Sequence, residues 1–269
     1  MGRPTGLLYK PISLPPDGAA VYGRALGALR EAGLSYLVGG AWAMAHLAGV
    51  CRSTKDLDLF VRPADLAPVL DALAGAGFDV EVVSPRWLAK AWRGPLFVDI
   101  IFSSGNGIAT VDDAWLTHAI PGEALDQPVL FCPVEETIWS KAWIMERERY
   151  DGADVVHLLR ACGAELDWER LLARFGEHWR VLYGHLVLFG YVYPGERAPV
   201  PTWVLRELGD KLSAELLAPA GTAPSPLLCR GTLLSKQYLH DLDELGYIGP
   251  DEPLPLTLHD PKRSHRSRG

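Results

Sequence analysis

The spacing of apolar and polar residues divides the chain into two parts of different character. In the first part, short apolar runs bounded by glycine, proline or polar residues predict strands, and segments with apolar residues every three or four positions predict helices. The predicted strands cover residues 34–39, 56–61, 78–83 and 96–102, and the predicted helices cover 18–32, 41–47 and 63–74. We expect Asp17 to cap the first helix and Pro63 to open the third. This alternation predicts an α/β unit with a small mixed sheet flanked by helices.

From Pro133 onward the strand pattern nearly disappears. The predicted helices in this part cover residues 134–149, 153–161, 168–175, 204–217 and 233–245. We therefore predict an α/β domain at residues 1–130, a mostly helical domain at 131–259 and a disordered basic tail at 260–269. The tail is expected to be solvated rather than bound to nucleic acid.

Composition and charge exclude several classes of protein. With 48% hydrophobic residues among 269, the chain can bury a substantial core and is not a disordered or fibrous protein. Its formal net charge of -7 argues against a broad basic surface that coats nucleic acid. The longest apolar run, residues 181–193, is shorter than the roughly 20 residues that span a bilayer, and the N-terminus lacks the apolar core of a signal peptide. The four cysteines form no Cys-x-x-Cys pair, so we expect no zinc site, no disulfide framework and a soluble, cytoplasmic protein.

Candidate chemistry is concentrated between residues 34 and 102. Gly39 and Gly40 lie between a predicted strand and a predicted helix, where the backbone can approach a phosphate and direct free amides at it. Asp56 and Asp58 are separated by one residue on a predicted strand, so their carboxylates share one face and can share a divalent cation. Asp99 lies between apolar neighbours on another predicted strand. If these strands are adjacent, the three carboxylates form a cluster suited to a two-metal site.

Other interpretations of these residues remain open. Asp56 and Asp58 can be ordinary residues at a strand end, and Asp99 can be a core carboxylate paired with Arg52 or Lys55. A second Asp-x-Asp pair, Asp241 and Asp243, falls in a predicted helix. Residues two apart on a helix diverge by about 200°, so we do not expect that pair to bind one metal.

The order of these residues resembles the nucleotidyltransferase superfamily of the DNA polymerase β type. Its signature is a Gly-Gly or Gly-Ser pair, a helix, an Asp-x-Asp strand and a later third carboxylate. The run from Arg52 to Phe60 is most similar to abortive-infection and type IV toxin–antitoxin nucleotidyltransferases, and more distantly to aminoglycoside nucleotidyltransferases and tRNA CCA-adding enzymes. The helix after the glycines lacks the Arg-Asp pair of CCA-adding enzymes. The resemblance covers residues 34–102 and extends weakly to 133–159, where the toxin-like branch has a lysine, arginines and an Asp-x-x-Asp turn.

This resemblance implies a nucleotidyltransferase fold and an enzyme that transfers a nucleoside monophosphate from a nucleoside triphosphate, such as ATP, to an acceptor hydroxyl with release of pyrophosphate. It implies Mg²⁺ as the cofactor, with Mn²⁺ as the alternative. The implied catalytic and metal-binding residues are Asp56, Asp58 and Asp99, and the implied nucleotide-binding residues are Gly39, Gly40, Arg52, Thr54, Lys141 and Asp154. In the weaker second segment, the pattern of the toxin-like branch falls on Lys141, Arg147, Arg149, Asp151 and Asp154.

The resemblance leaves the acceptor open. A small molecule such as an aminoglycoside, the 3′ end of a tRNA and a protein side chain are the three classes, and the negative net charge favours a cationic small molecule over RNA. The alternative to an enzyme is a nucleotide-binding regulatory protein without turnover or a toxin–antitoxin partner. The three carboxylates favour the enzyme.

Overall fold

The computed structural model describes residues 12–146, 149–219, 228–233 and 240–247. The predicted tail at 260–269 and much of the last predicted helix lie outside these residues. In that region the described residues form a 3-10 turn, Gly231–Leu233, and a short helix α10, His240–Asp243.

Among the described residues, seven strands form one mixed sheet; the sequence predicts a mixed sheet but only four of these strands. They are β1 (Leu37–Val38), β2 (Asp56–Phe60), β3 (Asp79–Ser84), β4 (Leu88–Arg93), β5 (Leu96–Ile101), β6 (Ile120–Ala124) and β7 (Gln127–Phe131). Their order across the sheet is β3-β4-β5-β2-β1-β7-β6. Strand β2 is parallel to β5, β1 is parallel to β7, and the other neighbours are antiparallel. The two strands that carry the predicted carboxylates, β2 and β5, are therefore adjacent.

One face of the sheet packs against two helices. Helix α1 (Gly18–Glu31) and helix α3 (Leu66–Gly75), which follows the 3-10 turn Pro63–Asp65, contact each other and strands β3, β4 and β5. Leu57 and Leu59 on β2, with Val98 and Ile100 on β5, are fully buried and belong to the core beneath these helices. Because side chains alternate along a strand, the intervening residues of β2 and β5 lie on the opposite face.

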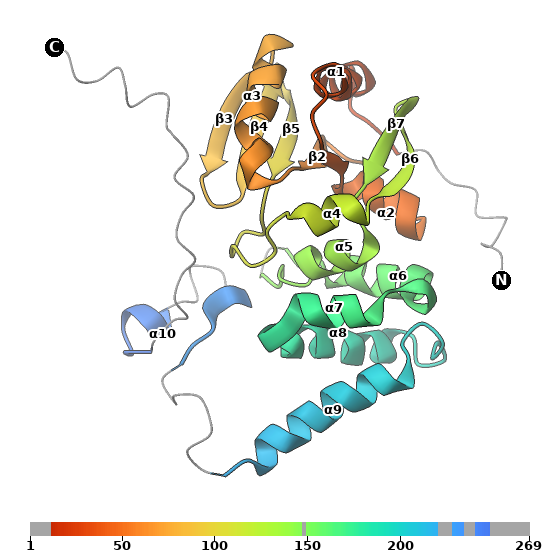
Figure 1. Ribbon diagram of the computed structural model, residues 1–269, viewed down its shortest axis with the longest axis vertical. Helices are drawn as coiled ribbons and strands as arrows, with labels where there is room; N and C mark the ends of the chain where they lie inside the picture. The colour runs from red at the N-terminus through yellow and green to blue at the C-terminus, as the bar shows by residue number, and fades with distance from the viewer. Residues whose placement is uncertain (1–11, 147–148, 220–227, 234–239, 248–269) are drawn as a thin grey trace.

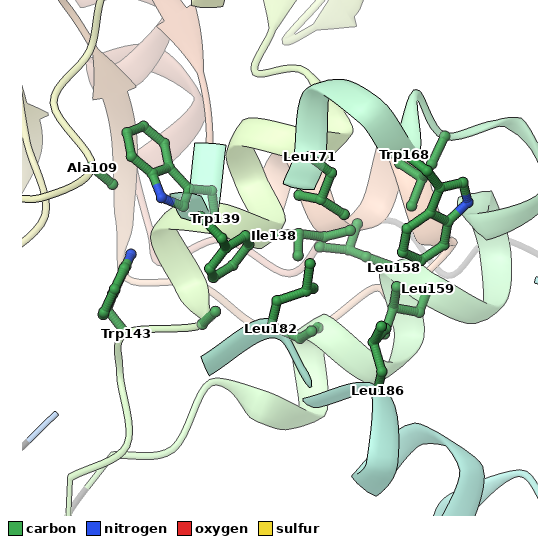
Figure 2. Packing of buried hydrophobic residues seen from close by; sticks show 14 of the residues in the cluster. Ala109, Ile138, Trp139, Trp143, Leu158, Leu159, Trp168, Leu171, Leu182 and Leu186 are labelled. Carbon is green, nitrogen blue, oxygen red and sulfur yellow. The ribbon is translucent and has the colours of Figure 1, made fainter. Parts of the chain in front are cut away.

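The second half of the chain is a stack of helices (Figure 1). They are α5 (Val134–Lys141), α6 (Gly152–Cys162), α7 (Trp168–Phe175), α8 (Trp179–Val192) and α9 (Thr202–Leu217), with 3-10 turns at Gly163–Glu165 and Gly176–His178. The short helix α4 (Asp113–Thr117), between β5 and β6 in the chain, precedes them. Figure 2 shows Ile138, Leu158, Leu171 and Leu182, one from each of α5 to α8, meeting in its core. No helix in the described part of the chain is both long and apolar enough to span a bilayer.

A buried carboxylate connects three of these helices. Glu136 on α5 is fully buried and accepts hydrogen bonds from Arg170 and Arg174 on α7 at 2.7–3.0 Å. Arg174 also donates to Asp112, whose side chain caps α4. A buried carboxylate is tolerated only when it is paired in this way, so this network fixes how α4, α5 and α7 lie together.

Three strands, β4, β6 and β7, and two helices, α4 and α8, were not expected from the sequence. The hairpin of β6 and β7 turns at Leu125 and Asp126, which have φ of 53° and 57°. Asn-Gly or Asp-Gly usually marks such a turn, and Leu-Asp gives no such signal. Strand β4 alternates small and large residues, and the sequence analysis assigns no element there. Helix α8 covers most of the apolar run at residues 181–193.

Two local predictions were wrong. Asp17 does not cap α1 with its side chain; it has φ of 62°, and the Pro15 carbonyl accepts the Gly18 N–H at 3.0 Å. The helix predicted at residues 134–149 ends at Lys141. Beyond it the chain folds back, with an antiparallel bridge between Met145 and Tyr150, because Lys141 pairs with Asp151 across the turn.

Candidate active site

The turn between β1 and α2 (Gly40–Ala48) fits glycine alone. Gly39 donates its N–H to the Asp58 carbonyl at 2.9 Å, and Gly40 has φ of 53°. A Cβ on Gly39 would overlap the Phe60 ring, and one on Gly40 would overlap the Asp58 carboxylate. No side chain caps the start of α2. The free amides of the first turn of α2 therefore lie next to an aspartate, in a position that can bind a phosphate once that carboxylate is neutralised.

The sheet brings the three predicted carboxylates to one face. Asp56 and Asp58 alternate with buried leucines on β2, and Asp99 on β5 lies directly opposite Asp58 in the parallel pairing. Burial and the negative charges of Asp56 and Asp99 raise the pKa of Asp58 to about 7. The pKa of Asp99 is also raised, chiefly by burial. This face therefore carries more negative charge than its own cations balance, and a bound cation would relieve it.

The three carboxylates point in different directions. Asp58 lies against Gly40, on the β1 side of its strand, while Asp99 pairs with Lys90 on β4, with Nζ and Oδ1 2.5 Å apart. Asp56 accepts a hydrogen bond from the Thr54 hydroxyl at 2.8 Å. Within the described residues, no three His, Cys, Asp or Glu side chains are grouped closely enough to hold one metal ion. Asp99 pairs with Lys90, and not with Arg52 or Lys55 as the alternative interpretation had it.

A cluster of cations and aspartates borders this face from the helical half. Lys141 is buried at the end of α5, and its Nζ lies 3.0 Å from Asp151 and 2.7 Å from Asp154. Asp154 also accepts two hydrogen bonds from Arg52, at 3.0 and 3.1 Å. Asp151 accepts two from Arg149, at the same distances. We call these five residues the ion-pair cluster; Arg147, the other arginine of the predicted pattern, lies outside the described residues.

The ion-pair cluster influences the protonation of the acidic face, which is the part of the sheet that carries Asp56, Asp58 and Asp99. Burial alone would raise the pKa of Asp154, but Lys141 and Arg52 outweigh it and hold that pKa below its usual range. Lys141 and Arg149 also favour the charged form of Asp58, although they do not offset its burial. Of the predicted nucleotide-binding residues, Asp154 thus contacts both Arg52 and Lys141 at the edge of the acidic face.

Lys90 is the site residue that the sequence analysis missed. A signal was present in the alternation of Leu88-Ala-Lys-Ala-Trp-Arg93, which places Lys90 on the same face as its strand partner Asp99. To predict the contact, the sequence analysis must assign a hairpin of β4 and β5 that turns at Gly94, because only the pairing of these strands brings Lys90 next to Asp99.

Comparison with known proteins finds solved structures with a similar fold but no matching sequence family. No protein-family model matches the chain, and the curated proteins give no match. The antibiotic-resistance factor ANT(2'')-Ia is 19% identical with a TM-score of 0.46, over 62% of this chain and 95% of that one. The lincosamide antibiotic adenylyltransferase LnuA, bound to lincomycin, is 15% identical with a TM-score of 0.38, over 52% and 94%. An antigenic nucleotidyltransferase-like protein from Paracoccidioides brasiliensis is 16% identical with a TM-score of 0.36, over 66% and 94%.

Proposed function

We propose that the protein is a metal-dependent nucleotidyltransferase. An acceptor hydroxyl oxygen forms a bond to the α-phosphorus of a nucleoside triphosphate, the bond from that phosphorus to the bridging oxygen breaks, and pyrophosphate leaves. The observation that carries the proposal is the register of β2 and β5, which sets Asp58 beside Asp99 while Asp58 also lies against the first turn of α2. This arrangement supports a site in which phosphate-binding amides and carboxylates that can hold a cation act together.

The residues present fit a divalent ion. Carboxylate oxygens are the ligands that Mg²⁺ and Mn²⁺ prefer. Burial, together with the charges of Asp56 and Asp99, raises the pKa of Asp58 and so disfavours its charged form, which a bound cation would favour. Asp56 and Asp58 would hold the ion, with Asp56 fixed by Thr54. When bound, it would neutralise the triphosphate and hold it for in-line attack.

The chain's own groups would perform the remaining work. The amides of Gly40 and the first turn of α2 bind the β- and γ-phosphates. An ammonium group has three donors, and two of those on Lys141 face Asp151 and Asp154, so the third is the one that binds a phosphate oxygen. Lys90 pairs with Oδ1 of Asp99, and Oδ2 accepts the proton that the acceptor hydroxyl loses.

The acceptor belongs to the same proposal. The net charge of -7 supports a cationic small molecule ahead of the 3′ end of a tRNA, because like charges repel a polyanion. A protein side chain is the third class, and a partner in a toxin–antitoxin pair remains a prediction.

The test is a transfer assay with each of the four α-³²P-labelled nucleoside triphosphates and Mg²⁺. It is run against an aminoglycoside mixture, total tRNA and a protein extract, with pyrophosphate measured in parallel. We expect label in one acceptor class and an equal amount of pyrophosphate, both lost in Asp58→Asn. Nucleotide binding without pyrophosphate for any acceptor would instead support the regulatory alternative.

A further inference from the structure

Lys90 occupies a defined place in a charged row across the sheet. In the register of the sheet, Glu81 on β3 lies opposite Lys90 on β4, Lys90 lies opposite Asp99 on β5, and Asp99 lies opposite Asp58 on β2. Side chains directly opposite each other on neighbouring strands are the ones that interact. Lys90 thus has a carboxylate neighbour on each side, and it pairs with Asp99, the one nearer the acidic face.

The ammonium of Lys90 is held in this position from two sides. Its Nζ lies 2.5 Å from Oδ1 of Asp99, and the two side chains are 17% and 15% exposed. The same Nζ lies 3.9 Å from the centre of the Phe97 ring and 5.5 Å from that of Trp92. The two rings contact each other, with centres 4.7 Å apart. Cation–π contacts and a poorly solvated ion pair fix the charge far better than an exposed lysine would be fixed.

This arrangement separates Asp99 from the other two carboxylates. Asp58 faces the β1–α2 turn, whereas Asp99 faces β4 and gives one of its oxygens to Lys90. A second divalent ion that bridges Asp58 and Asp99 would need Asp99 to turn away from Lys90, leaving a partly buried ammonium beside a dication. Repulsion between two unscreened cations at such a distance opposes that state.

We propose that Lys90 is a positioning residue that supplies at Asp99 the positive charge of a second divalent ion, so that the site binds one such ion, at Asp56 and Asp58. The inference rests on the proposed function and makes it more specific. Lys90 holds Asp99 on the acceptor side, while the ion on Asp56 and Asp58 serves the triphosphate. The sequence predicts a three-carboxylate cluster suited to two metal ions. In this proposal the ion pair of Lys90 with Asp99 takes the place of the second ion.

The first experiment counts bound Mn²⁺ by electron paramagnetic resonance, with Mn²⁺ alone and with Mn²⁺ plus α,β-methylene-ATP, after correction for Mn²⁺ bound to free nucleotide. We expect Lys90→Met to bind one more Mn²⁺ per chain than the wild type, because the methionine keeps the length of the side chain and removes its charge. The control is Lys55→Met, which removes an exposed lysine next to Asp56 and should leave the count unchanged. Equal counts for wild type and Lys90→Met, or two ions in the wild type, would overturn the proposal.

A second variant decides the question even if Lys90→Met fails to fold. Asp99→Asn should leave the Mn²⁺ count of the wild type unchanged, since Asp99 holds Lys90 and not an ion. If Asp99 were a metal ligand, the same change would remove one ion per chain. The double variant Lys90→Met with Asp99→Asn, in which both charges are gone, should return to the wild-type count.

Kinetics separate this inference from the proposed function. We expect pyrophosphate release to rise with the first power of Mg²⁺ concentration in the wild type and toward the second power in Lys90→Met, with kcat about 100-fold lower at limiting Mg²⁺. A wild type that releases no pyrophosphate refutes the proposed function, and the Mn²⁺ counts then test the role of Lys90 independently. A wild type that turns over while the counts are equal refutes the role of Lys90 alone.

Discussion

Two groups of aspartates border the same site and differ in what surrounds them. On the sheet, Asp56, Asp58 and Asp99 share one face, Lys90 is the cation paired with Asp99, and the pKa values of Asp58 and Asp99 are raised. In the ion-pair cluster, Asp151 and Asp154 each contact two cations, and both pKa values are lowered despite burial. Burial acts in the same direction on all of these groups, so the difference comes from the balance of charge around them.

The comparison indicates which of the two groups of aspartates a bound cation would stabilise. The ion-pair cluster has three cations for two carboxylates, so both aspartates are fully paired within the chain, and Lys141 retains one donor. The acidic face is not neutralised, and it costs the fold free energy that a bound cation would recover. We infer that the cluster holds the helical half in place beside a site that is completed only by its ligands.

The largest expected effect is on catalysis. Asp58→Asn should lower kcat/KM for pyrophosphate release by about a thousandfold or more, equivalent to at least about 4 kcal/mol of transition-state stabilisation, because it removes a charged group at the reacting phosphates. The circular dichroism spectrum should be unchanged. The exposed Asp210 on α9 provides the control, since Asp210→Asn should retain wild-type kinetics. Turnover of Asp58→Asn within tenfold of the wild type would remove the acidic face from the mechanism.

The next effect is on stability and belongs to the ion-pair cluster. Lys141→Met should lower the free energy of unfolding by about 3 kcal/mol, because it leaves two buried carboxylates without their shared cation. Urea denaturation measures it. The matched control is Lys211→Met on α9, whose pair with Glu207 is exposed and should contribute less than about 1 kcal/mol. If both changes cost the same, the cluster is not what holds α5 and α6 together.

A smaller effect is the pH dependence of stability, which distinguishes the acidic face from the ion-pair cluster. The folded-state pKa of Asp58, about 7, lies above the ordinary value of 3.8, so the folded state binds the proton more tightly and the ion-free protein loses stability as pH rises from about 4 to 7. Asn does not titrate, so Asp58→Asn in EDTA at pH 8 should be more stable than the wild type by about 2 kcal/mol, roughly half of what the full shift would give. Added Mg²⁺ should narrow the difference. Parallel stability curves for the two proteins between pH 4 and 8 would show that Asp58 is solvated like any surface carboxylate.

The acidic face and its glycines were predictable from sequence because their signals are local. Alternation on residues 56–60 fixes which side chains share a face, and a Gly-Gly pair between a strand and a helix marks a close backbone approach. Each of these properties depends on a few neighbouring residues.

Lys90 and the ion-pair cluster could not be derived in the same way. Lys90 meets Asp99 only through the pairing of β4 with β5, and the sequence analysis assigned no strand at β4. Lys141 was expected on a long helix, yet its contacts with Asp151 and Asp154 require that helix to end and the chain to turn back. The residues after Lys141 have high helix propensity, but the ion pairs of Lys141 with Asp151 and Asp154 outweigh this propensity and end the helix.

The smallest effect concerns Arg52, which joins the loop before β2 to Asp154 on α6. Arg52 is 48% exposed, and Asp154 keeps its pair with Lys141 when Arg52 is removed, so Arg52→Met should cost no more than about 1 kcal/mol in urea denaturation. Arg180→Met, which removes an exposed arginine paired with Glu215 on α9, should cost a similar amount.

The two variants, Arg52→Met and Arg180→Met, should differ in kinetics. Two nitrogens of Arg52 donate to Asp154, but a guanidinium has five N–H donors, and those that remain can reach a phosphate. We therefore expect KM for the nucleoside triphosphate to rise about fivefold to tenfold in Arg52→Met, a loss of about 1 kcal/mol of binding, with no change in Arg180→Met. An unchanged KM in both would show that Arg52 serves only to join the two halves of the chain.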